Sequence, residues 1–257
     1  MKARTFIFLA ADDRNINKSH GRDNTQLLPS EVISTASGVL GEEYRMANNN
    51  VPNQLVMKGT TTIGLKAKDG VVLASDTRVT MGYYVAHKQG KKIYKIDDHL
   101  AMTIAGTVAD AQRVVDILTA NAHLYKINMG RPLPVASAAR FIANIMFSAR
   151  YVPLLTEALI GGVDDSGPHV FRLDPFGTVT EETCVSTGSG SPVAYGVLED
   201  AYKEDSHIKE LLPLIVRAIN AAMKRNAGTG DNFNVAVLDS KGYRELSEKE
   251  KKQLLSD

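Results

Sequence analysis

The order of strand-like and helical segments constrains the fold of this 257-residue chain more than any other feature of its sequence. Strand-like runs come in groups, joined by short polar connections such as Lys68-Asp69-Gly70, in which Asp-Gly is a strong hairpin signal. Pairs of helical stretches separate these groups. Grouped strands with segregated helices are typical of antiparallel sheets covered by helices. The sequence therefore predicts an α+β protein, a four-layer αββα sandwich of two antiparallel sheets between helical layers.

The individual elements follow from hydrophobic periodicity and from turn residues. Strands are predicted at about residues 61–67, 71–76, 92–96, 100–105, 157–163, 169–173, 178–186 and 232–239. Helices are predicted at about residues 108–125, 135–150, 193–202, 209–225 and 247–255. The Gly161-Gly162 pair and residues 174–177 are interpreted as flexible or turning segments. No internal repeat or linker divides residues 60–257, so we expect a single domain there.

The composition of the chain changes near residue 58. Residues 1–58 are rich in Asn and other polar residues and have few long apolar patterns, which predicts a weakly ordered leader. Met46 and Met57 within it are candidates for an alternative translation start. The apolar residues that follow Met1 resemble the beginning of a signal peptide, but Asp12-Asp13-Arg14 comes at once, so we do not expect secretion.

Charge and residue usage exclude several classes of function. The 30 basic and 29 acidic residues give a net charge of +1, which argues against nucleic acid or a membrane surface as the main partner. The single cysteine, Cys184, excludes a disulfide framework within the chain and favours the cytoplasm. The six histidines lack metal-ligand spacing, and Gly188-Ser189-Gly190 lacks the Lys-Ser/Thr of a phosphate loop. We therefore expect no metal and no organic cofactor.

Five separated motifs give the chain a resemblance to a known family. The string Gly59-Thr60-Thr61-Thr62 by itself indicates only a strand. It is followed in order by LASDTR at 73–78, GKKI at 90–93, IAGT at 104–107 and STGSGSP at 186–192. Together these motifs resemble the β subunits of archaeal-type 20S proteasomes, over nearly all of residues 59–245. The resemblance implies the N-terminal-nucleophile hydrolase fold, a threonine endopeptidase activity, and a leader (1–59) removed by self-cleavage, so that the catalytic domain (60–257) begins at Thr60.

The chemistry of an N-terminal threonine supports this interpretation. A threonine hydroxyl is a poor nucleophile until a base takes its proton. The α-amino group of Thr60 could be that base, because the pKa of an α-amine is about 7.7–8.0, near working pH. While Gly59 is attached, the Thr60 nitrogen is an amide and cannot be a base, so the precursor is expected to be inactive. Gly59 has no side chain and can adopt the tight geometry that the cut requires.

The resemblance also assigns roles to charged residues near Thr60. Lys92 would lower the pKa of the Thr60 hydroxyl and amine, and Asp76 would orient Lys92. The local sequence leaves alternatives open, because Lys91-Lys92 could be a solvated pair and Arg78 could be the partner of Asp76. On a strand only one of two adjacent lysines faces inward, and the register after the glycine that precedes them selects Lys92.

Further residues are assigned to substrate binding by the same resemblance. The backbone N–H of Gly106 would bind the oxyanion of the tetrahedral intermediate, although Ala105-Gly106 could be only a break between strand and helix. Thr80 would hold the substrate backbone as an added strand. The pocket for the residue before the cut would be lined by Val79, Tyr94, Ile104 and Val108. Because these side chains are mostly apolar, we predict cleavage after hydrophobic residues.

One group of site residues departs from the family pattern. Ser189 matches a family serine close to the N-terminal amine, but Asn226 stands where Asp is usual and Thr229 where Ser is usual. Thr229 keeps a hydroxyl, whereas Asn226 loses a negative charge. Asp231 is near in sequence, with no sign that it compensates. We therefore expect reduced activity or slower self-cleavage, and complete inactivity is the alternative.

The partners of such a chain also follow from the resemblance. It implies a ring of seven β subunits, contacts with seven-membered rings of α subunits, a regulatory ATPase, and unfolded proteins as substrates. Two rival hypotheses stay open. The chain could be a scaffolding β subunit that fills the ring without cutting, with Asn226 as the support. It could also be another hydrolase of the same fold, either a subunit of a bacterial two-ring protease or a small-molecule amidase.

Overall fold

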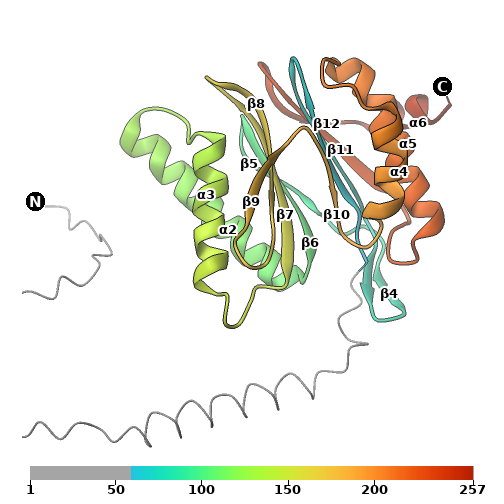
Figure 1. The fold of residues 1–257 in the computed structure, drawn as a ribbon, viewed down its shortest axis with the longest axis horizontal. Coiled ribbons are helices and arrows are strands. Elements are labelled where there is room, and N and C mark those ends of the chain that lie inside the picture. The colour runs from blue at the N-terminus through green and yellow to red at the C-terminus, as the bar shows by residue number, and fades with distance from the viewer. Residues whose placement is uncertain (1–58, 257) are drawn as a thin grey trace, which may run out of the picture. The chain divides into compact units, whose positions relative to one another are not determined.

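Two five-stranded antiparallel sheets form the centre of the fold, with helices on their outer faces (Figure 1). The structure is a computed structural model that describes residues 59–256, so the expected leader lies outside the described residues except for Gly59. One sheet has the strand order β10 (Cys184–Thr187), β1 (Thr62–Ala67), β2 (Gly70–Asp76), β11 (Phe233–Asp239) and β12 (Gly242–Glu245). The other has the order β5 (Ile93–Asp97), β6 (Leu100–Gly106), β7 (Thr156–Asp164), β8 (Gly167–Leu173) and β9 (Val179–Glu182).

Helices cover each sheet on the side that faces away from the other sheet. Helices α2 (Val108–Met129) and α3 (Val135–Ser148) pack on the sheet that contains β7, whereas α4 (Ser191–Ala201) and α5 (Ile208–Arg225) pack on the sheet that contains β1 (Figure 1). Helix α6 (Glu248–Ser256) follows β12. The predicted four-layer sandwich is therefore confirmed. No helix within residues 59–256 is long and apolar enough to cross a membrane.

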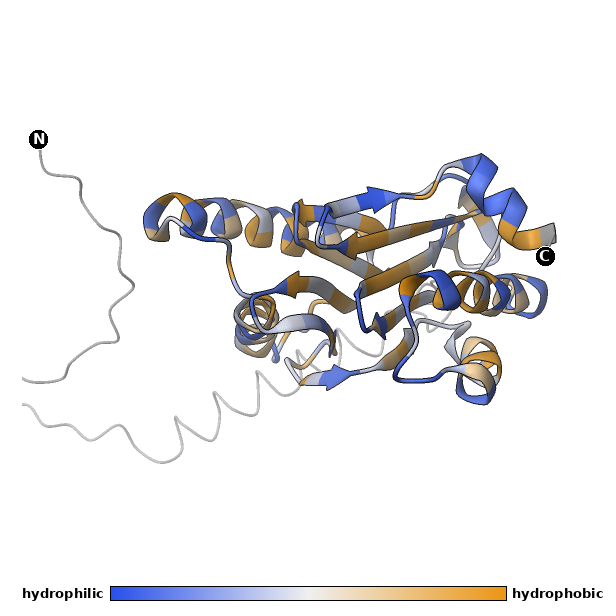
Figure 2. Cartoon of the chain, turned by 90° about the horizontal axis from the view of Figure 1, so that it is seen from above, coloured by the Kyte–Doolittle hydropathy of each residue, from blue (hydrophilic) through white to orange (hydrophobic). Residues whose placement is uncertain are grey.

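The core consists of three hydrophobic clusters, one between the sheets and one beneath each helical layer. Strand β2 contributes to two of them because successive side chains of a strand point to opposite faces. Val71 and Leu73 pack between the sheets, whereas Val72 and Ala74 pack against the layer of α4 and α5. The central strands are accordingly mostly hydrophobic, in contrast to the largely hydrophilic α6 (Figure 2). Burial on both faces holds the strands that carry the site residues in place.

The strand predicted at 178–186 is wrong as a single element. The chain forms β9 in one sheet and β10 in the other, and Thr183 lies at the crossing, where its carbonyl accepts a hydrogen bond from the N–H of Lys66 at 2.8 Å. Sequence periodicity misses this change because no Gly or Pro interrupts the segment. The short hairpin of β3 (Val79–Met81) and β4 (Tyr84–His87) and the strand β12 were not predicted either.

The interpretation of Gly161-Gly162 as a flexible or turning segment is also wrong. Both residues lie inside the central strand β7. A Cβ on Gly161 would lie 2.9 Å from Cγ1 of Val71 in the facing sheet, and a Cβ on Gly162 would lie 2.5 Å from the carbonyl oxygen of His99. A side chain at Gly162 would overlap the neighbouring backbone, and one at Gly161 would force the side chains between the sheets to shift.

Candidate active site

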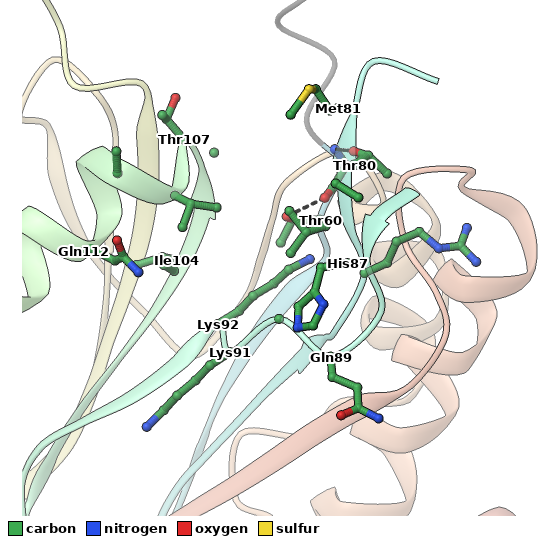
Figure 3. Close-up of a pocket in the computed structure, with 18 of the residues that line it drawn as sticks. Thr60, Thr80, Met81, His87, Gln89, Lys91, Lys92, Ile104, Thr107 and Gln112 are labelled. Atoms are coloured by element: carbon green, nitrogen blue, oxygen red, sulfur yellow. Dashed lines mark hydrogen bonds between the residues drawn. The ribbon is translucent and has the colours of Figure 1, made fainter. Parts of the chain in front are cut away.

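Thr60 lies two residues before β1, a strand that pairs with β10 on one side and with β2 on the other. Its side chain is buried, and its Oγ1 donates a hydrogen bond to the carbonyl oxygen of Gly59 at 2.6 Å. The N–H of Gly59 in turn donates to Oγ1 of Thr80 on β3 at 3.0 Å. The hydroxyl of Thr60 is therefore held against the peptide group that precedes it (Figure 3).

Asp76 and Lys92 form a buried ion pair beside Thr60. Nζ of Lys92 lies 2.8 Å from Oδ1 of Asp76. Lys92 extends toward Thr60, whereas Lys91 extends away from it (Figure 3). The carboxylate of Asp76 also accepts hydrogen bonds from the backbone N–H groups of Thr61, Arg78 and Gly230, at 2.9, 3.1 and 3.2 Å. These backbone donors come from three separate segments, so they fix the acceptor that positions the ammonium group.

The side chain of Arg78 is directed to other partners. Its Nε donates to Oδ2 of Asp231 at 2.8 Å, and its guanidinium also donates to the carbonyl oxygen of Ala227 at 2.8 Å. The alternative ion pair between the Arg78 side chain and Asp76 is therefore not formed. Asp231 is committed to Arg78 and makes no hydrogen bond to the Asn226 side chain in the described structure.

Burial governs the protonation of this ion pair. It lowers the pKa of Lys92 below its ordinary value of 10.5, because desolvation of the ammonium outweighs the attraction of Asp76, and the charge of Arg78 lowers it further. It raises the pKa of Asp76 above its ordinary value of 3.8, against the opposing effects of Lys92 and of the backbone hydrogen bonds. A lysine with a pKa shifted by burial and by a specific charge partner inside a cleft is a candidate functional residue.

Ser189, Asn226 and Thr229 form a hydrogen-bond network next to the Thr60 nitrogen. The N–H of Thr60 donates to Oγ of Ser189 at 3.3 Å, and the Ser189 hydroxyl donates to Oδ1 of Asn226 at 2.9 Å. Oδ1 also accepts from the Thr229 hydroxyl at 3.0 Å, while Oγ1 of Thr229 and Oγ1 of Thr61 lie 2.7 Å apart. The predicted group is thus brought together by the loop before α4 and by the C-terminal end of α5.

The amide of Asn226 has only one orientation that suits its neighbours. Its Nδ2 donates to the carbonyl oxygen of Ser189 at 3.0 Å, and a carbonyl oxygen can only accept. The opposite orientation would place two acceptor oxygens against each other. Asn226 therefore uses both its donor and its acceptor, which a carboxylate of the same shape could not do.

A cavity of about 550 Å³ opens beside Thr60, and all the predicted pocket residues line it. Val79, Tyr94, Ile104 and Val108 line it, together with Thr80, Lys92 and Gly106. Gly106 ends β6 with a φ of +128°, and a Cβ there would lie 2.2 Å from the carbonyl oxygen of Leu155. Only glycine fits this backbone.

Several polar side chains in the cavity wall were not predicted. Among them, His87 ends β4, Gln89 lies two residues after this strand, and Gln112 projects from α2 (Figure 3). Gln112 lies four residues after Val108, so helical spacing could have placed both on one face of α2. The hairpin that brings in the other two has no clear sequence signal. The cavity wall is therefore less uniformly apolar than the sequence suggested.

Comparison with known proteins identifies the relatives of this chain. A family model described as proteasome subunit matches residues 56–238. The "Proteasome subunit beta 2" of Nitrosopumilus maritimus is 46% identical over 208 residues, which are 81% of this chain and 99% of that relative. The proteasome subunit beta of Methanosarcina mazei is 45% identical over 201 residues, or 78% and 96% of the two chains. That of Methanothermobacter thermautotrophicus is 47% identical over 195 residues, or 76% and 93%.

Proposed function

Because this chain belongs to the proteasome subunit family, as a β subunit with the N-terminal-nucleophile hydrolase fold, we propose that it is a catalytic threonine endopeptidase of the 20S core particle. Its nucleophile is Thr60, exposed when the chain cuts its own bond between Gly59 and Thr60. In this proposal residues 1–59 are a leader and residues 60–257 are the catalytic domain. The β family is of the peptidase type, and the proposal adds that this particular subunit cuts.

The observation that carries the proposal is the arrangement of Thr60, Lys92 and Asp76. The nucleophile and a buried ammonium group line one cavity, and the carboxylate of Asp76 fixes that ammonium at 2.8 Å. A purely scaffolding subunit has no need for a buried ion pair, since replacing such a pair by apolar residues is often neutral or stabilising. The retention of the pair beside a hydroxyl that touches the preceding carbonyl favours chemistry at Thr60.

Self-cleavage is proposed as an intramolecular acyl shift. Oγ1 of Thr60 forms a bond to the carbonyl carbon of Gly59, the C–N bond between the two residues breaks, and the hydroxyl proton ends on the nitrogen. The backbone N–H of Gly106 is proposed to stabilise the negative charge on the carbonyl oxygen. Water then hydrolyses the ester, which gives the carboxylate of Gly59 and restores the hydroxyl of Thr60.

Peptide hydrolysis repeats this chemistry with the new amine as base. The α-amine of Thr60 takes the hydroxyl proton while Oγ1 bonds to the carbonyl carbon of the substrate. The peptide C–N bond then breaks, the departing amine takes that proton from the α-amine, and water hydrolyses the acyl ester that remains on Oγ1. Ser189 and Asn226 are proposed to orient the amine, and Thr80 to hold the substrate backbone. Val79, Tyr94, Ile104 and Val108 are proposed to receive a hydrophobic side chain, and the polar Gln112 adds a hydrogen-bonding group to the same wall.

As a proteasome β subunit, the chain assembles with other proteasome subunits. We propose that its partners are seven-membered α rings and other β subunits, with a regulatory ATPase delivering unfolded proteins in the cytoplasm. Exposed apolar side chains near the end of α2, among them Leu124, Ile127 and Met129, support an assembled state because they suit a protein contact. The second candidate function is a scaffolding β subunit, favoured only by the uncharged Asn226.

Intact mass after co-expression with the α partner tests the proposal. We expect a chain that begins at Thr60, and a Thr60→Ala chain that keeps its leader in rings of the same size. Labelling of the Thr60 hydroxyl by a peptide epoxyketone should follow in the wild type alone. A wild-type chain that keeps its leader in assembled rings would support the scaffolding function instead.

A further inference from the structure

The backbones of Gly59 and Gly228 touch each other across the site. A Cβ added to Gly59 would lie 1.9 Å from Cα of Gly228, and one added to Gly228 would lie 2.2 Å from Cα of Gly59. Both distances are far below any real contact of a Cβ. The opposing atoms belong to the backbone, so no side chain can rotate away to relieve the overlap. While the bond between Gly59 and Thr60 is intact, each glycine therefore excludes a side chain at the other position.

The requirement for glycine at position 228 comes from this contact and not from its own backbone. Gly228 is not among the glycines with a positive φ, so alanine could adopt its conformation. Two of the three atoms nearest to an added Cβ belong to Gly59. The third is Oδ1 of Asn226 at 3.3 Å, which needs to move by only a few tenths of an ångström. Once Gly59 has left, the main obstacle to a side chain is gone.

The same contact distinguishes the leader from a substrate. A substrate that fills the apolar pocket must carry a Cβ on the residue before the cut. That Cβ could not occupy the position it would have on Gly59, because Gly228 blocks it. The substrate residue must therefore bind in another conformation or further from the loop that carries Gly228. One nucleophile would then have two specificities, glycine for its own activation and a hydrophobic residue for its substrates.

We propose that Gly228 is a positioning residue for self-cleavage alone. Gly228 holds the Gly59 backbone in place. In this position the N–H of Gly59 donates a hydrogen bond to Oγ1 of Thr80 at 3.0 Å, and the carbonyl oxygen of Gly59 accepts one from Oγ1 of Thr60 at 2.6 Å. The attack forms the bond from Oγ1 to the Gly59 carbon, breaks the C–N bond and transfers the hydroxyl proton to nitrogen. This inference rests on the proposed function, because it concerns the same cut.

The test compares Gly228→Ala with wild type and with Gly196→Ala in the full chain, co-expressed with the α partner. Gly196 is the matched control, since it lies in α4 and an added Cβ would meet nothing within 4 Å. Displacing reacting atoms by about 1 Å costs on the order of 100-fold in rate, so Gly228→Ala should slow loss of the leader by about 10- to 100-fold. Intact mass against time measures this rate. Peptidase activity per epoxyketone-labelled Thr60 should stay within about twofold of wild type.

Each outcome decides the matter. Cutting of Gly228→Ala at the wild-type rate overturns the inference, and so does a parallel loss of activity per labelled site. If Gly228→Ala does not assemble, Gly59→Ala is the second variant, because it creates the same overlap from the other side and leaves the loop of Gly228 unchanged. Loss of the leader from Gly59→Ala at the wild-type rate would overturn the inference as well. If wild type and Gly196→Ala both keep their leaders in assembled rings, the proposed function itself fails and the inference falls with it.

Discussion

Nζ of Lys92 lies 2.8 Å from Oδ1 of Asp76, and the two side chains are only 8% and 0% exposed. The carboxylate is fixed by backbone N–H groups at both of its oxygens, so the ammonium has one defined position in the wall of the cavity that also contains Thr60. This relationship gives Lys92 a role that a solvated lysine could not perform. It also makes the charge of Lys92 testable separately from its bulk.

Lys92→Met keeps much of the side-chain length and removes the charge. We expect self-cleavage and epoxyketone labelling to fall by about 100- to 1,000-fold, the usual cost of removing one preorganised electrostatic contact in an active site. Lys95→Met is the matched control, because Lys95 lies exposed on β5, the strand that begins directly after Lys92, and pairs with Asp98. Intact mass and labelling of both variants provide the measurement. Normal loss of the leader in Lys92→Met would contradict the role proposed for this lysine.

The lowered pKa of Lys92 predicts opposite effects of alkaline pH on activity and stability. As the pH rises through this pKa, below the ordinary 10.5, the folded chain loses the ammonium and labelling of Thr60 should slow. Between the lowered pKa and 10.5 the unfolded chain still holds a proton that the folded chain has released. The contribution of Lys92 to the free energy of unfolding therefore rises with pH in this window.

Two measurements check this pH dependence. Labelling rate against pH gives the alkaline limb of activity, and the difference in unfolding free energy between wild type and Lys92→Met isolates this lysine from the others. A labelling rate that stays constant up to pH 10.5 would show that the ammonium is not required.

Asn226→Asp tests the uncharged member of the Ser189 network. A carboxylate near the Thr60 amine favours the protonated amine, so the acidic limb of peptidase activity should move to higher pH by on the order of one unit. The change also replaces the Nδ2 donor that now faces the Ser189 carbonyl. Asn220→Asp, six residues earlier on α5, is the control for charge alone.

The same pH profile tests the sequence-based expectation that Asn226 reduces activity, which stays a prediction. A higher plateau in Asn226→Asp than in wild type would support it. A lower plateau would indicate that the amide, with its donor and acceptor both used, is the better residue in this chain. An acidic limb that does not move would contradict the proposed influence of this position on the Thr60 amine.

Gly161→Ala should destabilise the sandwich without touching the site. The added methyl would press on Val71 and Leu73 between the sheets, and overpacking of this kind costs about 1–3 kcal/mol. Gly196→Ala should leave the free energy of unfolding unchanged or raise it by up to about 1 kcal/mol, because α4 has open space there and alanine favours helix. Denaturant unfolding of the two variants compares them directly. Equal stability would mean that the sheets can separate enough to admit the methyl.

Much of the fold could be predicted because its signals are local. The Asp69-Gly70 turn and the apolar run of β2, which is buried on both faces, can be recognised from neighbouring residues. The change of sheet at Thr183 has no such signal, since both β9 and β10 read as continuous strand and only long-range pairing separates them. The β3–β4 hairpin was missed for a related reason, because it belongs to neither large sheet.

In the candidate site, too, some residues could be predicted from the sequence and some contacts could not. Lys92 and Asp76 could be named from motifs, and the structure places them in contact. The contact between Gly59 and Gly228 could not be predicted, because 169 positions separate the two residues and neither has a side chain to suggest an interaction. The orientation of the Asn226 amide likewise depends on the carbonyl of Ser189, which only the folded loop supplies.

Thr60 stands two residues before a strand that is paired along both of its edges, where Thr62 already faces Thr187 and Ser75. Chain termini usually fray and sample many conformations. Loss of the leader would create a terminus without that freedom, so the amine and hydroxyl would have little conformational entropy to lose when a peptide arrives. The first residue of the shortened chain would then be as immobile as a residue in the protein interior.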